Sequence, residues 1–154
     1  MPSEYIMYLS ILLVGTLAIG GISATMVAIN NTMEERAIEV NLENILQSIT
    51  KVIHDVKENG DNQVELGATD LSYINILAIP EEIQEEEYII EVTSTNTSYS
   101  LKASLKEDPE FFISVSLLIS PDTITISGSI DSTGNAPKVI YIFDGISSSI
   151  LLAN

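Results

Sequence analysis

The stretch YIMYLSILLVGTLAIGGISATMVAIN, from Tyr5 to Asn30, contains no charged side chain. The 25 residues from Tyr5 to Ile29 are mostly apolar. As an α-helix that rises about 1.5 Å per residue, they would extend roughly 37 Å. A hydrocarbon core of about 30 Å needs about 20 apolar residues in a helix. The stretch therefore predicts a helix that can span a membrane.

The residues around this stretch argue against a secretory signal peptide. Such a signal has a positive start and an apolar core of only about 7–15 residues, whereas this chain starts MPSEY, with Glu4 and no basic residue. The charged residues also do not indicate how the helix is oriented in the membrane, because Arg36 stands directly after Glu34 and Glu35. A basic leader that is removed after insertion would supply the missing positive charge.

Small residues recur within the apolar stretch. Such a stripe lets two helix backbones approach closely, although small residues are also generally frequent in spanning helices. Both readings stay open, and the first predicts tight helix-on-helix packing in the core of an assembly. The residues concerned are Thr16, Gly20, Ala24 and Ala28 at a spacing of four, with Gly21 beside them.

From Asn31 onward the sequence becomes charged and amphipathic without a break. Leu46 and Ile53 widen a seam of apolar residues into a face that is broad enough to cover a core. The gaps along this seam are 4, 3, 4, 3 and 4, which is the spacing of one helix face. We expect the seam to pack on the rest of the protein through Ile38, Leu42, Ile45, Ile49, Val52 and Val56.

One continuous helix is predicted over residues 1–60. Its first part, residues 1–30, is the hydrophobic assembly or transmembrane segment, and residues 31–60 are amphipathic. The sequence ENG that ends at Gly60 predicts the end of the helix, because glycine suits the left-handed cap position.

Residues 61–154 are predicted to form a β-rich domain. Several runs alternate apolar and polar residues, and turn-forming pairs such as Asp144–Gly145 separate them. The pattern predicts an α+β fold, in which the long helix packs on an antiparallel sheet or small sandwich. The inward-facing residues are expected to include Tyr88, Ile90 and Val92 in one run, and Tyr99, Leu101, Ala103 and Leu105 in the next.

The composition limits the function. The chain carries 22 acidic and 6 basic residues, a net charge of -16, which argues against binding nucleic acid because phosphates would be repelled. It has no cysteine, and its single histidine, His54, makes a histidine-based metal site or triad improbable. No catalytic constellation is evident, so we expect a non-enzyme without cofactors. The acidic run Glu81–Glu87 is either a solvated loop or a calcium site.

Two sequons provide candidate N-glycosylation acceptors at Asn30 and Asn96. They matter only if the β-rich domain is exported. Asn30 is also close to the hydrophobic segment, where a sugar would be difficult to attach.

The order of these parts resembles type IV pilins, and more particularly the archaeal pilins and pilin-like proteins, a design that archaellins share. The similarity is one of layout over the whole chain and is strongest in residues 3–60. The tail from Gly134 to Asn154 is similar to the closing hairpin of some pilin-like proteins. The resemblance implies insertion into the cytoplasmic membrane as a precursor, removal of a short basic leader, and extraction by the pilus assembly machinery into an extracellular homopolymer with the helices at its centre.

The resemblance also gives a role to Glu4, the residue nearest to the carboxylate that bacterial pilins carry at the fifth mature position. It implies that Glu4 pairs with the N-terminal amine of a neighbouring subunit. The alternative is that Glu4 stabilises the positive N-terminal pole of its own helix.

The sequence thus predicts the structural subunit of a surface filament, with adhesion favoured over motility. One alternative is a single-pass, membrane-anchored pilin-like accessory protein with an extracytoplasmic β domain. Another is an archaellin of a motility filament. A membrane-tethered enzyme or ligand-binding module is the remaining reading.

Overall fold

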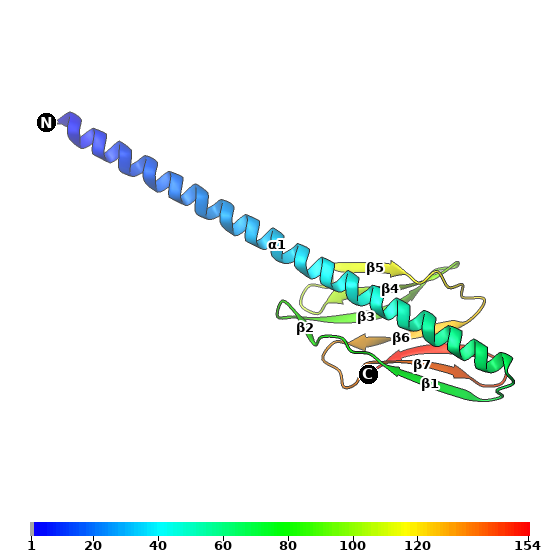
Figure 1. The fold of residues 1–154 in the computed structure, drawn as a ribbon. Helices are drawn as coiled ribbons and strands as arrows, with labels where there is room; N and C mark the ends of the chain where they lie inside the picture. The colour runs from blue at the N-terminus through cyan, green and yellow to red at the C-terminus, as the bar shows by residue number, and fades with distance from the viewer. Residues whose placement is uncertain (1) are drawn as a thin grey trace. The chain divides into compact units, whose positions relative to one another are not determined.

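A computed structural model describes the backbone of residues 2–154 and the side chains of residues 5–154. It contains one helix, α1 (Pro2–Glu65), followed by strands (Figure 1). The α+β fold predicted from the sequence is confirmed, with the long helix packed on the sheet that follows it. The strands are β1 (Leu71–Ile76), β2 (Glu82–Ile83), β3 (Glu86–Ser94), β4 (Tyr99–Leu105), β5 (Phe112–Ser116), β6 (Thr125–Asp131), β7 (Lys138–Phe143) and β8 (Ser148–Ala153).

The chain forms two compact units, residues 1–37 and residues 38–154. We call the second the head unit. It begins at Ile38, within α1, rather than at residue 61, because the amphipathic part of the helix belongs to the same core as the strands. The part of α1 from Ile38 to Glu65 is therefore a structural part of the head unit.

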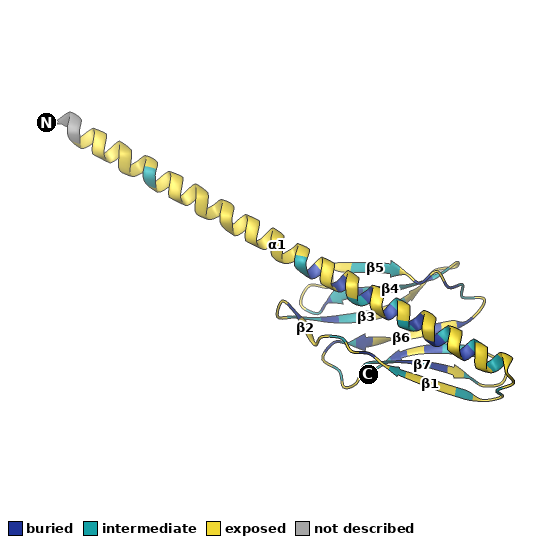
Figure 2. Ribbon diagram, viewed as in Figure 1, coloured by how far each residue is buried: buried dark blue, intermediate teal, exposed yellow. Residues whose placement is uncertain are grey.

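The buried face of α1 follows the predicted spacing, with a shift in its centre. Leu46 and Ile53 are 0% exposed, whereas Ile45 and Val52 are only partly buried. Figure 2 shows the buried positions returning along one side of the helix where it crosses the sheet. Leu46 and Ile53, which were expected at the margin of the buried face, therefore form its centre. The fully covered positions of α1 are Leu42, Leu46, Ile49, Ile53 and Val56, with Ile38 nearly so.

The prediction that Gly60 ends the helix is wrong, since α1 continues to Glu65. Gly60 lies inside the helix and faces the ring of Tyr141, where an added Cβ atom would lie 2.5 Å from ring carbons. Glycine is used there for close packing. The residue with the left-handed backbone is Gly67, with φ of 98°, and its N–H donates to the carbonyl of Val64 at 2.9 Å.

The strands form one hydrogen-bonded sheet in the order β1-β7-β8-β6-β3-β4-β5, with β2 paired to β3 beside this path. Most neighbours are antiparallel, as expected, but β6 and β8 are parallel, so the sheet is mixed. The tail forms the predicted closing hairpin, because β7 and β8 pair with Lys138 opposite Ala153. Figure 1 shows the later part of α1 lying across one face of this sheet.

The predicted alternation of the strands is confirmed. In β3, Tyr88 and Ile90 are fully buried, and Val92 packs against the same core. All four predicted inward residues of β4, from Tyr99 to Leu105, are buried. The period of two places these side chains on the face that α1 covers.

The position of the centre of the buried helix face can be tested by replacing isoleucine with valine at a fully buried and at a partly buried position. We expect Ile53→Val to lower the free energy of unfolding by about 1 kcal/mol, because it removes a fully buried methyl group. Ile45→Val should lower it by less than about half of that amount, because Ile45 is only partly buried. Denaturant unfolding of the two variants measures both values. Equal losses would contradict the assignment of the centre.

Candidate assembly surface

The first unit presents an apolar surface on every side of the helix. Sixteen large apolar side chains between Tyr5 and Met33 are each 52–73% exposed. We call residues 5–33 the apolar segment. By length and composition α1 could cross a membrane, since it contains an 18-residue window with a mean hydropathy of 2.1. Lipid or other protein must therefore cover it in its working environment.

Four hydroxyl groups of the apolar segment donate to the backbone of their own helix. Ser10 donates to the carbonyl of Ile6 at 2.8 Å, and Thr25 donates to the carbonyl of Gly21 at 2.8 Å. Thr16 and Thr32 form equivalent bonds, each one turn back along the helix. A hydroxyl that already has a partner can enter an apolar environment at a lower cost. These residues are therefore compatible with burial in lipid or between helices.

The small residues of the predicted stripe are exposed. In the described chain, no heavy atom lies within 4 Å of a Cβ atom built at Gly20 or at Gly21. At about 100° per residue, a spacing of four turns the stripe by about 40° at each step. It therefore winds slowly around the helix and would suit a neighbour that crosses at an angle. The stripe comprises Thr16, Gly20, Ala24 and Ala28, with Gly21 beside its later part.

The remaining predicted sites differ in accessibility. Asn96 is exposed in the turn between β3 and β4, whereas Asn30 is exposed within the apolar segment of α1. The side chain of Glu4 lies outside the described residues. Among the described residues, no group of three or more histidine, aspartate or glutamate side chains is arranged to hold a metal ion.

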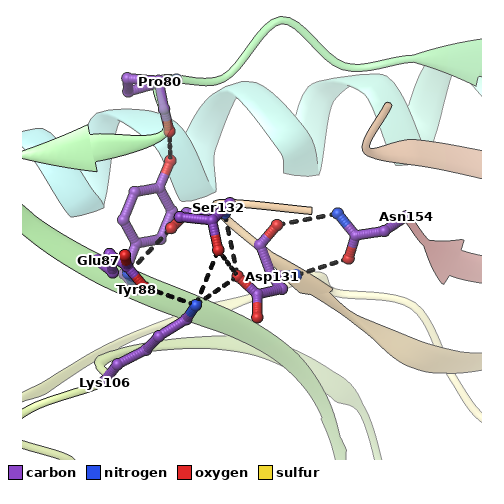
Figure 3. Close-up of polar contacts among 8 residues, drawn as sticks. Pro80, Glu87, Tyr88, Lys106, Asp131, Ser132 and Asn154 are labelled. Atoms are coloured by element: carbon purple, nitrogen blue, oxygen red, sulfur yellow. Dashed lines mark hydrogen bonds and ion pairs between the residues drawn. The ribbon is translucent and has the colours of Figure 1, made fainter. Parts of the chain in front are cut away.

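An ion-pair cluster that the sequence did not indicate joins three strand ends of the head unit (Figure 3). The ammonium of Lys106 lies 2.8 Å from the Glu87 carboxylate and 2.8 Å from the Asp131 carboxylate. It also donates to Thr133 Oγ1 at 2.9 Å. The Asp131 carboxylate and then the Glu87 carboxylate raise the pKa of Lys106, which keeps it charged. The lysine is therefore suited to holding strand ends together and unsuited to acting as a nucleophile.

The last residue of the chain completes this cluster. The side-chain amide of Asn154 donates to the Asp131 carbonyl at 2.9 Å, and its oxygen accepts the Asp131 N–H at 2.7 Å. The two bonds, drawn in Figure 3, continue the pairing of β6 with β8 beyond the last residues of β8. Gly134 packs directly against this amide, so a side chain at Gly134 would displace it.

Tyr88 connects the cluster to the core. Its hydroxyl donates to the Pro80 carbonyl at 2.6 Å, and its N–H donates to Ser132 Oγ at 3.1 Å. Burial raises the pKa of Tyr88 to about 12. The phenol therefore remains a neutral donor at physiological pH and acts as a structural tie.

The cluster predicts a loss of stability in acid. Hydrogen bonding to Lys106, and then to the Thr133 N–H, lowers the pKa of Asp131 below its ordinary value, which is about 3.9 in an unfolded chain. A lowered folded-state pKa stabilises the protein above the unfolded value, and this stability is lost as the pH falls through the folded value. Asp131→Asn should therefore lower the melting temperature at pH 6 and have little effect near pH 2.

Thermal unfolding of the full chain in detergent at the two pH values measures this difference. Asp144→Asn is the matched control, because the pKa of Asp144 is also lowered, by the backbone N–H groups of Ser147 and Ile146, but Asp144 has no contact with Lys106. Adding Lys106→Met should reduce the effect of Asp131→Asn, because only the Thr133 bonds to Asp131 remain, and should leave the effect of Asp144→Asn unchanged. If Asp131→Asn lowers the melting temperature equally at both pH values, the stabilising role of the ionised Asp131 carboxylate is contradicted.

No protein-family model, no curated protein and no solved structure matches this chain.

Proposed function

We propose that this protein is the structural subunit of an extracellular, pilus-like filament that polymerises through its apolar segment, with surface adhesion as its role. The observation that supports this most strongly is the apolar segment itself, whose large side chains are exposed on all sides. It directly precedes a head unit with a complete core of its own. A segment without partners within its own chain, attached to a folded unit, is what a polymer of packed helices requires.

The energy available from this segment is large. Burying a large apolar side chain contributes roughly 1.5–3 kcal/mol, so sixteen of them offer on the order of 25–50 kcal/mol gross. Lipid can supply that burial before assembly, and sister helices can supply it afterwards. Only sister helices also gain close backbone contact at the small-residue stripe. The chain would therefore leave the membrane and enter the filament, with the help of a pilus assembly machinery.

The charge distribution is compatible with this role. All acidic residues except Glu4, and all 6 basic residues, follow the apolar segment, so the water-facing part has 21 acidic and 6 basic residues and a net charge of -15. Heads of like charge on neighbouring fibres repel, which opposes bundling at low salt. We expect fibres that remain dispersed in low salt and associate laterally as salt is added.

The direct test is to shear surface material from the cells that make this protein. Negative-stain microscopy should show thin fibres, and mass spectrometry should identify this chain as a main component. The mature N-terminus should be read from the same fibres, because it shows whether a leader was removed. Fibres that lack the chain, in cells that express it, would refute the proposal.

A second candidate is a single-pass, membrane-anchored accessory protein with the head unit outside the membrane. The length and apolar composition of the helix support a membrane anchor as well as they support a filament subunit, because they satisfy the requirement for a spanning helix. Fractionation separates the two candidates. An accessory protein would remain in the membrane fraction when the cells are sheared, whereas a filament subunit would be released with the fibres.

A further inference from the structure

Two apolar side chains project into solvent at one end of the head unit. Leu66 directly follows α1 and is 81% exposed, and Ile146 lies in the turn between β7 and β8 and is 93% exposed. Their loops touch, because a Cβ atom built at Gly145 would lie 2.9 Å from the carbonyl oxygen of Thr69. We call Leu66 and Ile146, with the loops that carry them, the apolar tip.

The outward position of Ile146 is fixed by its turn. The Asp144 carboxylate accepts the N–H of Ile146 at 2.9 Å and the N–H of Ser147 at 2.8 Å. These bonds lower the pKa of Asp144 and keep it ionised. A large apolar side chain that an ordered turn holds in water contributes nothing to the core of its own chain, so Ile146 remains free for a contact with another molecule.

The apolar tip is also uniformly acidic. Asp70 and Asp144 lie in its two loops, Glu65 ends α1 directly before Leu66, and residues 59–70 and 144–148 contain no basic residue. A complementary partner must therefore offer an apolar surface together with a positive charge.

One surface of the first unit has these two properties. A shallow groove on the helix is lined by apolar and small side chains and ends at Arg36. Arg36 is the only basic residue before Lys51, and it forms no ion pair with any described residue. We call this surface the arginine groove, and its lining residues are Thr25, Ala28, Ile29, Thr32, Met33 and Arg36.

The acidic neighbours of Arg36 leave the groove available. At about 100° per residue, Glu35 and Glu34 project roughly 100° and 160° away from Arg36 around the helix. Glu39, one turn later, is close enough in sequence to pair with Arg36, yet the two form no ion pair in the described structure. The Arg36 guanidinium can therefore form an ion pair with a carboxylate of another molecule.

We propose that the apolar tip of one copy of this chain docks into the arginine groove of a second copy. This inference rests on the proposed function, and it assigns a head-to-helix contact between subunits. Leu66 and Ile146 would cover Ile29 and Met33, while Arg36 would pair with an acidic residue of the tip. Because the tip and the groove are different surfaces, the contact is heterologous and can repeat without closing.

The chain contains no cysteine, so engineered pairs can test this contact without background. A full-length variant that carries both Ile146→Cys and Met33→Cys should form disulfide-linked dimers, trimers and longer ladders when its fibres are mildly oxidised. The matched control combines Leu118→Cys with Met33→Cys. Leu118 is 86% exposed and follows β5, at the opposite edge of the sheet from β1, so the control fibres should give no ladder.

A second measurement uses the charge. Arg36→Glu should reduce the yield of fibres at least tenfold, and the double variant Arg36→Glu with Asp70→Lys should recover part of that loss. Fibres of the test pair that give no ladder, or a control that cross-links equally well, would overturn the docking inference and leave the proposed function intact. The absence of this chain from any fibre would overturn both.

Discussion

Replacing Gly20 with leucine is expected to reduce the number of fibres at least tenfold while the head unit remains folded. In the described chain nothing lies within 4 Å of a Cβ atom at this position, so the larger side chain meets no obstacle in the isolated subunit. Leucine is also the better helix former, by about 0.8 kcal/mol. Any loss of assembly must therefore arise between subunits, where leucine would separate two closely packed backbones.

Fibre counts by negative-stain microscopy measure the effect, and circular dichroism of the detergent-solubilised chain monitors the fold. Gly15→Leu is the matched control. It is also a glycine of the apolar segment with open space around it, and it projects about 140° away from Gly20 around the helix. If Gly20→Leu assembles as well as Gly15→Leu, close packing along the small-residue stripe is refuted.

The parts of this fold that are visible in the sequence are those set by local periodicity. The alternation in β4 predicted its four inward residues because a strand places every second side chain on one face. The seam of α1 was visible for the same reason, at a period of 3.6. Its centre was shifted, since Leu46 and Ile53 lie deeper than Ile45 and Val52. A helix seam shows which side is buried, but the depth of each residue depends on the sheet beneath it.

The features that the sequence did not reveal depend on residues that are distant along the chain. Lys106 meets Glu87 and Asp131 only because β3, β4 and β6 are neighbours in the sheet. The parallel pairing of β6 with β8 has the same origin, because the β7–β8 hairpin places β8 against β6. No local pattern specifies such neighbours.

The candidate assembly surface was predictable in outline. Its length and lack of charge can be read directly from the sequence, whereas the internal hydrogen bonds of its hydroxyl groups required the structure. The apolar tip was not predicted, because Leu66 and Ile146 lie in short loops where single apolar residues carry no periodic signal. Their exposure, at 81% and 93%, is the informative property.

Gly60→Leu should destabilise the head unit by about 3 kcal/mol or more. A Cβ atom alone would lie 2.5 Å from carbons of the Tyr141 ring, a distance that real side chains do not tolerate. The gain in helix propensity, about 0.8 kcal/mol, is too small to compensate. The ring has little freedom to move, because the Tyr141 hydroxyl donates to Asp61 at 3.0 Å and shares a hydrogen bond with Ser148 at 2.8 Å.

Denaturant unfolding of the full chain measures this loss, and the matched control is Gly67→Asn in the left-handed cap. Gly67 has no atom within 4 Å of an added Cβ atom in the described chain, and asparagine tolerates its backbone conformation, so that variant should lose less than about 1 kcal/mol. Combining Gly60→Leu with Tyr141→Ala should cost less than the sum of the two single variants, because removal of the ring relieves the overlap. Additive losses would show that Gly60 is required for a reason other than the Tyr141 contact, such as the path of α1 itself.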